Sequence, residues 1–218
     1  MNTQTHLLLA AALLCRPNRP RANAAVLAGA IVPDVGVTLL FAWGQASGVP
    51  PGDLWGPVYF GEPMQALQAV LNSVPLYAAL LLAGTLARRE RPAVPMNAPM
   101  NAPMNAPAGG WWGAIGALPP LALFALAALV HLAGDLPLHA DDAHRHFWPL
   151  TDWRFHSPVS YWDPAHHGTL ASIAEGILGV VLCVILWRRF QALWVRGLVL
   201  LAAAIYVGVP LYWSATMG

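Results

Sequence analysis

Long apolar stretches separated by short polar or proline-rich segments dominate this chain. A helix that crosses a bilayer needs roughly 20 apolar residues, and five stretches approach that length. An earlier apolar stretch, 3–15, is too short to span alone, and we expect it to form a re-entrant or half-buried helix packed against the others. The pattern predicts an all-α, polytopic membrane helix bundle that forms a single domain over residues 1–218, with five spans plus a short N-terminal helix. The predicted spans are 24–43, 64–87, 113–136, 168–187 and 196–213.

The composition agrees with a membrane protein. Hydrophobic residues make up 57% of the chain and charged residues 10%, whereas soluble domains carry about 25% charged residues. The formal net charge of +1 gives no reason to expect a nucleic-acid partner, so membrane lipid is the expected partner, and no protein partner is indicated. Cys15 and Cys183 both lie in or beside apolar stretches, where we expect small buried side chains and no disulfide.

The basic residues indicate an orientation. All eleven are arginines, and nine lie in three segments: 16–21, 88–91 and 188–196. The positive-inside rule places these segments in the cytoplasm. The other two loops, 44–63 and 137–167, then face the opposite side, which is the periplasm if the protein lies in a bacterial inner membrane.

Two loops differ sharply in composition. Residues 92–110 contain a repeated Pro-Met-Asn-Ala unit without an apolar face, which is typical of a disordered linker. Residues 137–167 hold six of the eight histidines together with several aspartates and tryptophans. Because a plain linker would not need so many aromatic side chains, we expect this loop to be a folded, non-cytoplasmic cap.

Five ionisable residues fall within apolar stretches, where charge is costly and usually functional: His6, Asp34, His131, Asp135 and Glu175. His131 and Asp135 are four residues apart, so a helix places them on one face, where they could bind one metal ion. A simple His–Asp hydrogen bond at a helix end is the alternative.

Asp34 follows Pro33, which frees a backbone carbonyl and can bend a helix toward a polar site. His6 and Asp34 each lie about 15–20 Å along a helix from the first arginine segment, at the 1.5 Å rise per residue of an α-helix, so we expect them at one depth. We therefore predict one metal site with His6, Asp34, His131 and Asp135 as its core. In the alternative, the four side chains only hydrogen-bond each other. The cap histidines expected to complete the site are His139, His146, His166 and His167.

These residues occur in an order that resembles a known family. Thr5-His6-Leu7, Pro33-Asp34, His131-x-x-x-Asp135 and the block from His146 to Pro158 are similar to the YdjM-like inner-membrane proteins, described as membrane-bound metal-dependent hydrolases. This sequence departs from the family at Gly36, where a second aspartate is usual, and lacks the family's His-Arg-Gly-x-Thr-His-Ser motif. It is also similar to short proteobacterial membrane proteins labelled as cobalamin-biosynthesis proteins, although it carries no amidotransferase or nucleotide motif.

The function expected from these features is metal-dependent hydrolysis of a lipid or phosphoester at the membrane surface. Histidine and aspartate ligands suit zinc or another divalent transition metal. Asp141, Asp142 or Glu175 could act as the general base, and the sequence does not choose among them. A metal or proton transporter and a non-catalytic scaffold remain the alternatives.

Overall fold

The computed structural model describes residues 1–89, 115 and 117–217, and the regular elements within these residues are all helical. Four helical stretches are long and apolar enough to cross a membrane, which indicates a multi-pass membrane protein. The fifth predicted span falls within α10 (Leu193–Met217), whose part Leu193–Gly208 is apolar. The linker predicted over 92–110 lies outside the described residues. The four long stretches are Pro20–Ser47, Glu62–Ala87, Pro120–Leu138 and Gly168–Arg189.

The helices follow one another with short connections, apart from the segment between α6 and α8 and the cap between α8 and α9. The α-helices are α1 (Thr3–Leu14), α2 (Pro20–Ile31), α3 (Val35–Ser47), α4 (Pro51–Asp53), α5 (Glu62–Leu71), α6 (Val74–Arg89), α8 (Pro120–Asp135), α9 (Gly168–Arg189) and α10 (Leu193–Met217). Shorter helical turns are η1 (Val32–Asp34), η2 (Leu54–Val58), η3 (Leu136–Leu138) and η4 (Pro164–His166).

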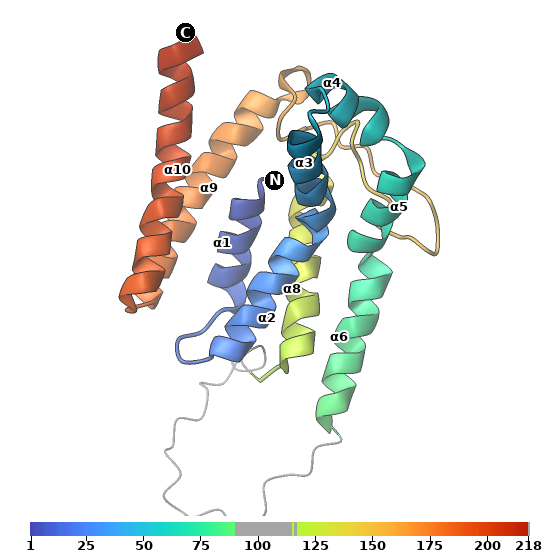
Figure 1. Ribbon diagram of the computed structural model, residues 1–218. Coiled ribbons are helices and arrows are strands. Elements are labelled where there is room, and N and C mark those ends of the chain that lie inside the picture. Colours follow the sequence, from blue (N-terminus) through green and yellow to red (C-terminus); the bar gives the residue numbers. More distant parts are fainter. Residues whose placement is uncertain (90–114, 116, 218) are drawn as a thin grey trace, which may run out of the picture.

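Helix α1 is inserted in the middle of the bundle (Figure 1), where it contacts α2, α8 and α9. The prediction that the residues before Arg16 pack into the bundle is therefore confirmed. Helix α2 also packs closely on α8: a Cβ atom added at Gly29 would lie 2.1 Å from the carbonyl oxygen of Phe124. Only glycine allows the two backbones to approach this far, and this close packing holds α8 beside the N-terminal helices.

The first long stretch bends where the sequence indicated. A single 3-10 turn, η1, joins α2 to α3 and contains Pro33 and Asp34. Proline cannot donate a backbone hydrogen bond, so the α-helical pattern changes locally at this residue. The turn places Asp34 beside α8, which η1 contacts.

The second long stretch, Glu62–Ala87, agrees with the predicted span over 64–87, but it is not one continuous helix. Helix α5 ends at Leu71 and α6 begins at Val74. The hydroxyl of Ser73 accepts a hydrogen bond from the N–H of Leu76, as an N-cap residue does. Pro75 has no N–H to donate to the carbonyl of Leu71, and the hydroxyl of Tyr77 donates to that carbonyl instead at 2.7 Å.

The connections that carry most of the arginines lie at the opposite end of the bundle from the cap, as the sequence predicted. The α1–α2 connection, the end of α6 and the α9–α10 connection lie at one end of the molecule, and the cap lies at the other (Figure 1). At the arginine end, Arg189 of α9 donates to the carbonyl oxygen of Ala12 in α1.

The cap is folded although most of it is irregular. The N–H of Ser157 donates to the carbonyl of His139 at 2.9 Å, and the N–H of Tyr161 donates to that of Leu138 at 3.0 Å. These bonds return the end of the cap to the top of α8. Residues 137–167 thus form a compact cover over the end of the bundle where the ionisable side chains lie.

Candidate metal centre

Three separate segments bring the central ionisable side chains together. His6 lies on α1, His131 and Asp135 lie one turn apart on α8, and Asp34 lies in η1. His6, His131 and Asp135 are each almost completely buried. The sequence therefore places four metal-ligating side chains at a point where α1, α2 and α8 meet.

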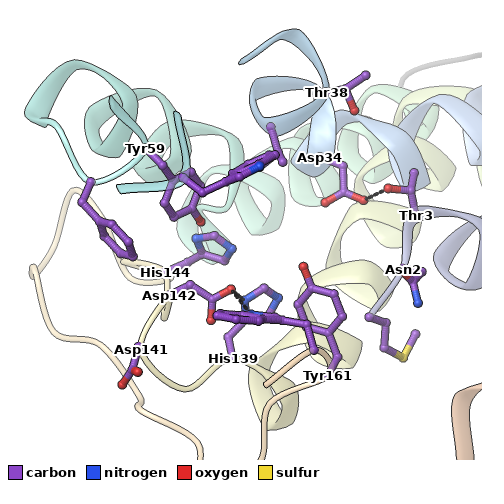
Figure 2. Close-up of a pocket in the computed structure, with 15 residues that line it drawn as sticks. Asn2, Thr3, Asp34, Thr38, Tyr59, His139, Asp141, Asp142, His144 and Tyr161 are labelled. Carbon is purple, nitrogen blue, oxygen red and sulfur yellow. Dashed lines mark hydrogen bonds and ion pairs between the residues drawn. The ribbon is translucent and has the colours of Figure 1, made fainter. Parts of the chain in front are cut away.

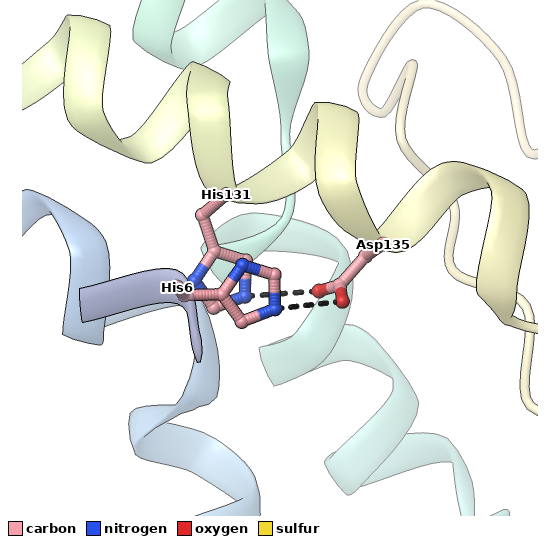
Figure 3. A group of neighbouring side chains, drawn as sticks. All are labelled: His6, His131 and Asp135. Atoms are coloured by element: carbon pink, nitrogen blue, oxygen red, sulfur yellow. Dashed lines mark hydrogen bonds and ion pairs between the residues drawn. The ribbon is translucent and has the colours of Figure 1, made fainter. Parts of the chain in front are cut away.

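One carboxylate faces the edges of both imidazoles (Figure 3). Nε2 of His6 is 2.9 Å from Oδ1 of Asp135, and Nε2 of His131 is 2.9 Å from Oδ2. The two rings are stacked, with their centroids 3.5 Å apart. The ligand atoms of these three residues all lie within 4.8 Å of one another, so the group could hold a metal ion.

The two ring nitrogens of His131 face different groups. Its Nδ1 lies 2.7 Å from the carbonyl oxygen of Ala30, which can only accept, so Nδ1 carries the proton. Its Nε2 makes no hydrogen bond within the described residues, although carboxylate oxygens of Asp135 and Asp34 lie 2.9 Å and 3.5 Å away. A neutral imidazole would direct a lone pair at this negatively charged region. A cation placed there would satisfy all three groups, and a backbone carbonyl on the other ring nitrogen is the usual arrangement around a metal-bound histidine.

Asp34 is held in position from the other side. The hydroxyl of Thr3 donates to Oδ2 of Asp34 at 2.5 Å, which leaves Oδ1 toward His131. The α-amino group of Met1 lies 2.6 Å from Oδ1 of Asp135. These contacts explain why α1 enters the bundle with its N-terminal end at the site.

His139 links the central group to the cap. Its Nε2 is 3.4 Å from Oδ1 of Asp135, and its Nδ1 is 3.0 Å from Oδ2 of Asp142. Burial lowers the pKa of His139, but Asp135 and Asp142 outweigh this effect and raise the pKa to about 9. The ring of His144 lies beside His139, and burial lowers the pKa of His144 to about 3, so this second histidine is neutral at physiological pH.

A cavity of about 580 Å³ opens beside this cluster (Figure 2). Asp34, His139, Asp142 and His144 form its polar part. Because Asp34 and His139 both contact the central residues, the cavity reaches the candidate metal centre. The lining also contains the aromatic residues Trp55, Tyr59, Phe60, Tyr161 and Trp162, and the ring of Tyr161 lies 5.2 Å from that of His139.

The remaining predicted ligands lie elsewhere in the cap. His146 is buried, with its Nδ1 3.2 Å from the carbonyl oxygen of Asn72. His166 is 2.7 Å from Asp163 and belongs with Asp141 to a second, more exposed group that could hold a metal ion. His167 is exposed and begins α9. Of the four predicted cap ligands, His139 lies at ion-pair distance from Asp135 in the described residues.

The three candidate bases have different surroundings. Asp141 and Asp142 both line the cavity, but Asp141 is exposed, whereas Asp142 is half-buried and faces His139. Glu175 is buried on α9 and accepts hydrogen bonds from the N–H of Asn2 and the hydroxyl of Thr5. A carboxylate at the N-terminus of a helix is favourable, so the contacts of Glu175 position α1.

Sequence reasoning did not identify Thr3, Thr5, Ala30 or Tyr161 as parts of this region. A threonine side chain or a backbone carbonyl does not indicate a functional site in a sequence, although Thr3 and Thr5 lie close to His6 in the chain. The chain was compared with protein-family models, curated proteins and solved structures, and no match was found.

Proposed function

We propose that His6, His131 and Asp135, with Asp34, hold a divalent transition metal, and that the protein hydrolyses a lipid or a phosphoester at the membrane surface. The observation that carries this proposal is His131, whose Nδ1 donates to a backbone carbonyl while its Nε2 lies at ion-pair distance from two carboxylates, 2.9 Å from Asp135 and 3.5 Å from Asp34. Two imidazoles with two carboxylates are a donor set suited to zinc. A bound zinc ion supplies Lewis acidity and lowers the pKa of water toward neutrality.

The surrounding residues have separate tasks in this proposal. Asp142 is the favoured general base, because it lines the cavity and lies 3.0 Å from Nδ1 of His139, which holds the carboxylate in place. Burial raises the pKa of Asp142, but His139 outweighs this effect and lowers it, so the carboxylate stays ionised. Asp141 is too exposed for this task, and Glu175 is engaged with the N-terminus of α1.

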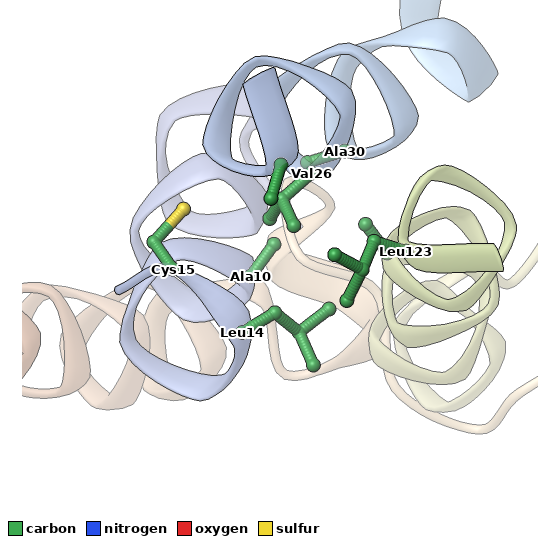
Figure 4. Close-up of a cluster of buried hydrophobic side chains, with 8 residues drawn as sticks. Ala10, Leu14, Cys15, Val26, Ala30 and Leu123 are labelled. Atoms are coloured by element: carbon green, nitrogen blue, oxygen red, sulfur yellow. The ribbon is translucent and has the colours of Figure 1, made fainter. Parts of the chain in front are cut away.

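The cavity lining supports an amphiphilic or phosphoester substrate. Its aromatic part can cover the apolar portion of a substrate, while its polar part lies next to the metal centre. A transporter is less well supported, because the core directly below the site is apolar (Figure 4). That core contains Ala10, Leu14, Val26, Ala30, Leu123 and Ala127.

A direct experiment combines metal analysis with turnover. The purified protein is stripped with a chelator, reloaded with zinc, and assayed in proteoliposomes against an activated phosphodiester and dye-labelled phospholipids. We expect zinc to bind stoichiometrically, to raise the melting temperature and to restore hydrolysis. Bound zinc without turnover would favour the scaffold function, and the absence of both would remove the metal proposal.

We also propose that the protein lies in a bacterial inner membrane with the cap in the periplasm. This orientation rests on the arginines, nine of which lie in segments 16–21, 88–91 and 188–196. A reporter enzyme inserted within residues 95–107 is expected to be active only in the cytoplasm. Activity of that fusion in the periplasm would reverse the topology.

A further inference from the structure

The break between α5 and α6 leaves backbone groups that the helices themselves cannot satisfy. Within a membrane, unpaired backbone groups are costly, so a broken helix is tolerated only where other protein groups pair with them. Here the break at Asn72–Ser73 lies within an apolar stretch, Glu62–Ala87, that is long enough to cross the membrane.

The cap supplies the missing partners. The carbonyl of His146 accepts from the N–H of Val74 at 2.8 Å, and the carbonyl of Trp148 accepts from the hydroxyl of Ser73 at 2.6 Å. Nδ1 of His146 lies 3.2 Å from the carbonyl of Asn72. This part of the cap therefore reaches down beside α5 to the level of the break, as Figure 1 shows.

The segment that follows these contacts exposes large apolar side chains. Leu150 is 78% exposed and Trp153 is 53% exposed. The aromatic rings of Phe147, Trp153 and Phe155 form a row, with neighbouring centroids 5.8 Å and 6.3 Å apart. The facing parts of α5 and α6 also expose apolar side chains, namely Leu67, Val70 and Leu76.

The arginines near this segment have polar partners. Arg145 lies 3.3 Å from Asp152 and 3.6 Å from Glu62, and Arg154 donates to Gln65. Asp152 is itself 77% exposed, which suits the polar headgroup region and not the hydrocarbon core.

We propose that residues 147–155 lie in the headgroup region of the outer leaflet and bind membrane lipid. Ser73 is 15 residues from Arg88, or roughly 22 Å along a helix, in a bilayer whose hydrocarbon core is about 30 Å thick. The break therefore lies in the outer third of the hydrocarbon core, about 8 Å below the outer boundary where aromatic side chains gather. This inference does not depend on the proposed metal centre or hydrolysis, but the choice of the outer leaflet rests on the proposed topology.

Depth-dependent fluorescence quenching tests this proposal directly. An environment-sensitive dye is attached to Leu150→Cys in proteoliposomes of phosphatidylcholine and phosphatidylglycerol, with Asp141→Cys on the exposed rim of the cap as the matched control. Ile177→Cys, on an exposed position of α9, marks the hydrocarbon region. The native Cys15 and Cys183 are buried, and the wild-type protein taken through the same reaction measures their background labelling.

We expect spin-labelled lipids to quench the dye at 150, more strongly when the spin label is near the headgroup than when it is deep in the acyl chain. Aqueous iodide should quench the dye at 141 far more than the dye at 150. Equal iodide quenching at the two positions would overturn the proposal. Protection from iodide without quenching by lipid would also overturn it, because a protein surface would then cover the segment. The measurement needs neither metal nor turnover, so its failure would leave the metal proposal standing.

Discussion

Replacing His131 by alanine is expected to abolish metal binding while leaving a folded protein that detergent extracts. His131 supplies the ring nitrogen that faces both Asp135 and Asp34, and no other described side chain occupies that position. Removing a residue that hydrogen-bonds to a metal ligand lowers metal affinity about 10- to 100-fold. Removing a direct ligand should therefore lower zinc affinity by more than about 100-fold. Hydrolysis should fall to the level of the chelator-treated wild type.

The matched control for this substitution is His156→Ala. Like His131, His156 donates from its ring to a backbone carbonyl, that of Ala140. Its side chain is exposed in the cap. We expect this variant to bind zinc like the wild type. Because His131→Ala leaves a buried cavity, His131→Gln provides a second test that keeps more of the volume. If either His131 variant retained full zinc affinity by calorimetric titration, the proposed ligand set would be wrong.

Replacing Asp135 by alanine is expected to lower the free energy of unfolding by about 3–5 kcal/mol in metal-free protein, the usual cost of removing one partner from a buried ion pair. Asp135 lies within 3.4 Å of His6, His131, His139 and the amino group of Met1. Removing it leaves these four groups without their common carboxylate. Chemical denaturation in mixed detergent micelles, followed by circular dichroism, measures the change.

The control for Asp135 is Asp141→Ala, which removes the same carboxylate from an exposed position in the cap. Exposed substitutions of this kind usually change stability by less than about 0.5 kcal/mol. If Asp135→Ala and Asp141→Ala unfolded at the same denaturant concentration, Asp135 would not be what holds α1 against α8. A variant that loses zinc but not stability would identify Asp135 as a ligand only.

Much of the helical framework could be predicted because it depends on local pattern. Long apolar stretches require helices in a bilayer, and α8 begins at Pro120 because proline suits the first turn of a helix. The interruption at Asn72–Ser73 was missed, although Ser73 followed by Pro75 is itself a helix-start signal. The high apolar content of residues 64–87 concealed it.

Part of the candidate site was also predictable. The spacing of His131 and Asp135 places them on one face of any helix, and equal distances from the arginine segment placed His6 and Asp34 at one depth. Both relations depend only on the rise and pitch of an α-helix. The loop histidines could not be sorted in this way, because irregular backbone has no fixed repeat, and contact with Asp135 distinguishes His139 from His146, His166 and His167.

The sequence by itself thus determined the membrane class, the main helices, the end of the bundle that carries the arginines, and the central residues of the candidate site. Only the tertiary structure decided which groups complete that site. The carbonyl of Ala30 faces His131 across 101 residues, and Glu175 reaches the N–H of Asn2 across 173 residues. Such partners depend on how helices pack and on where an irregular loop returns to the bundle, and neither is encoded in a local pattern of apolar and polar residues.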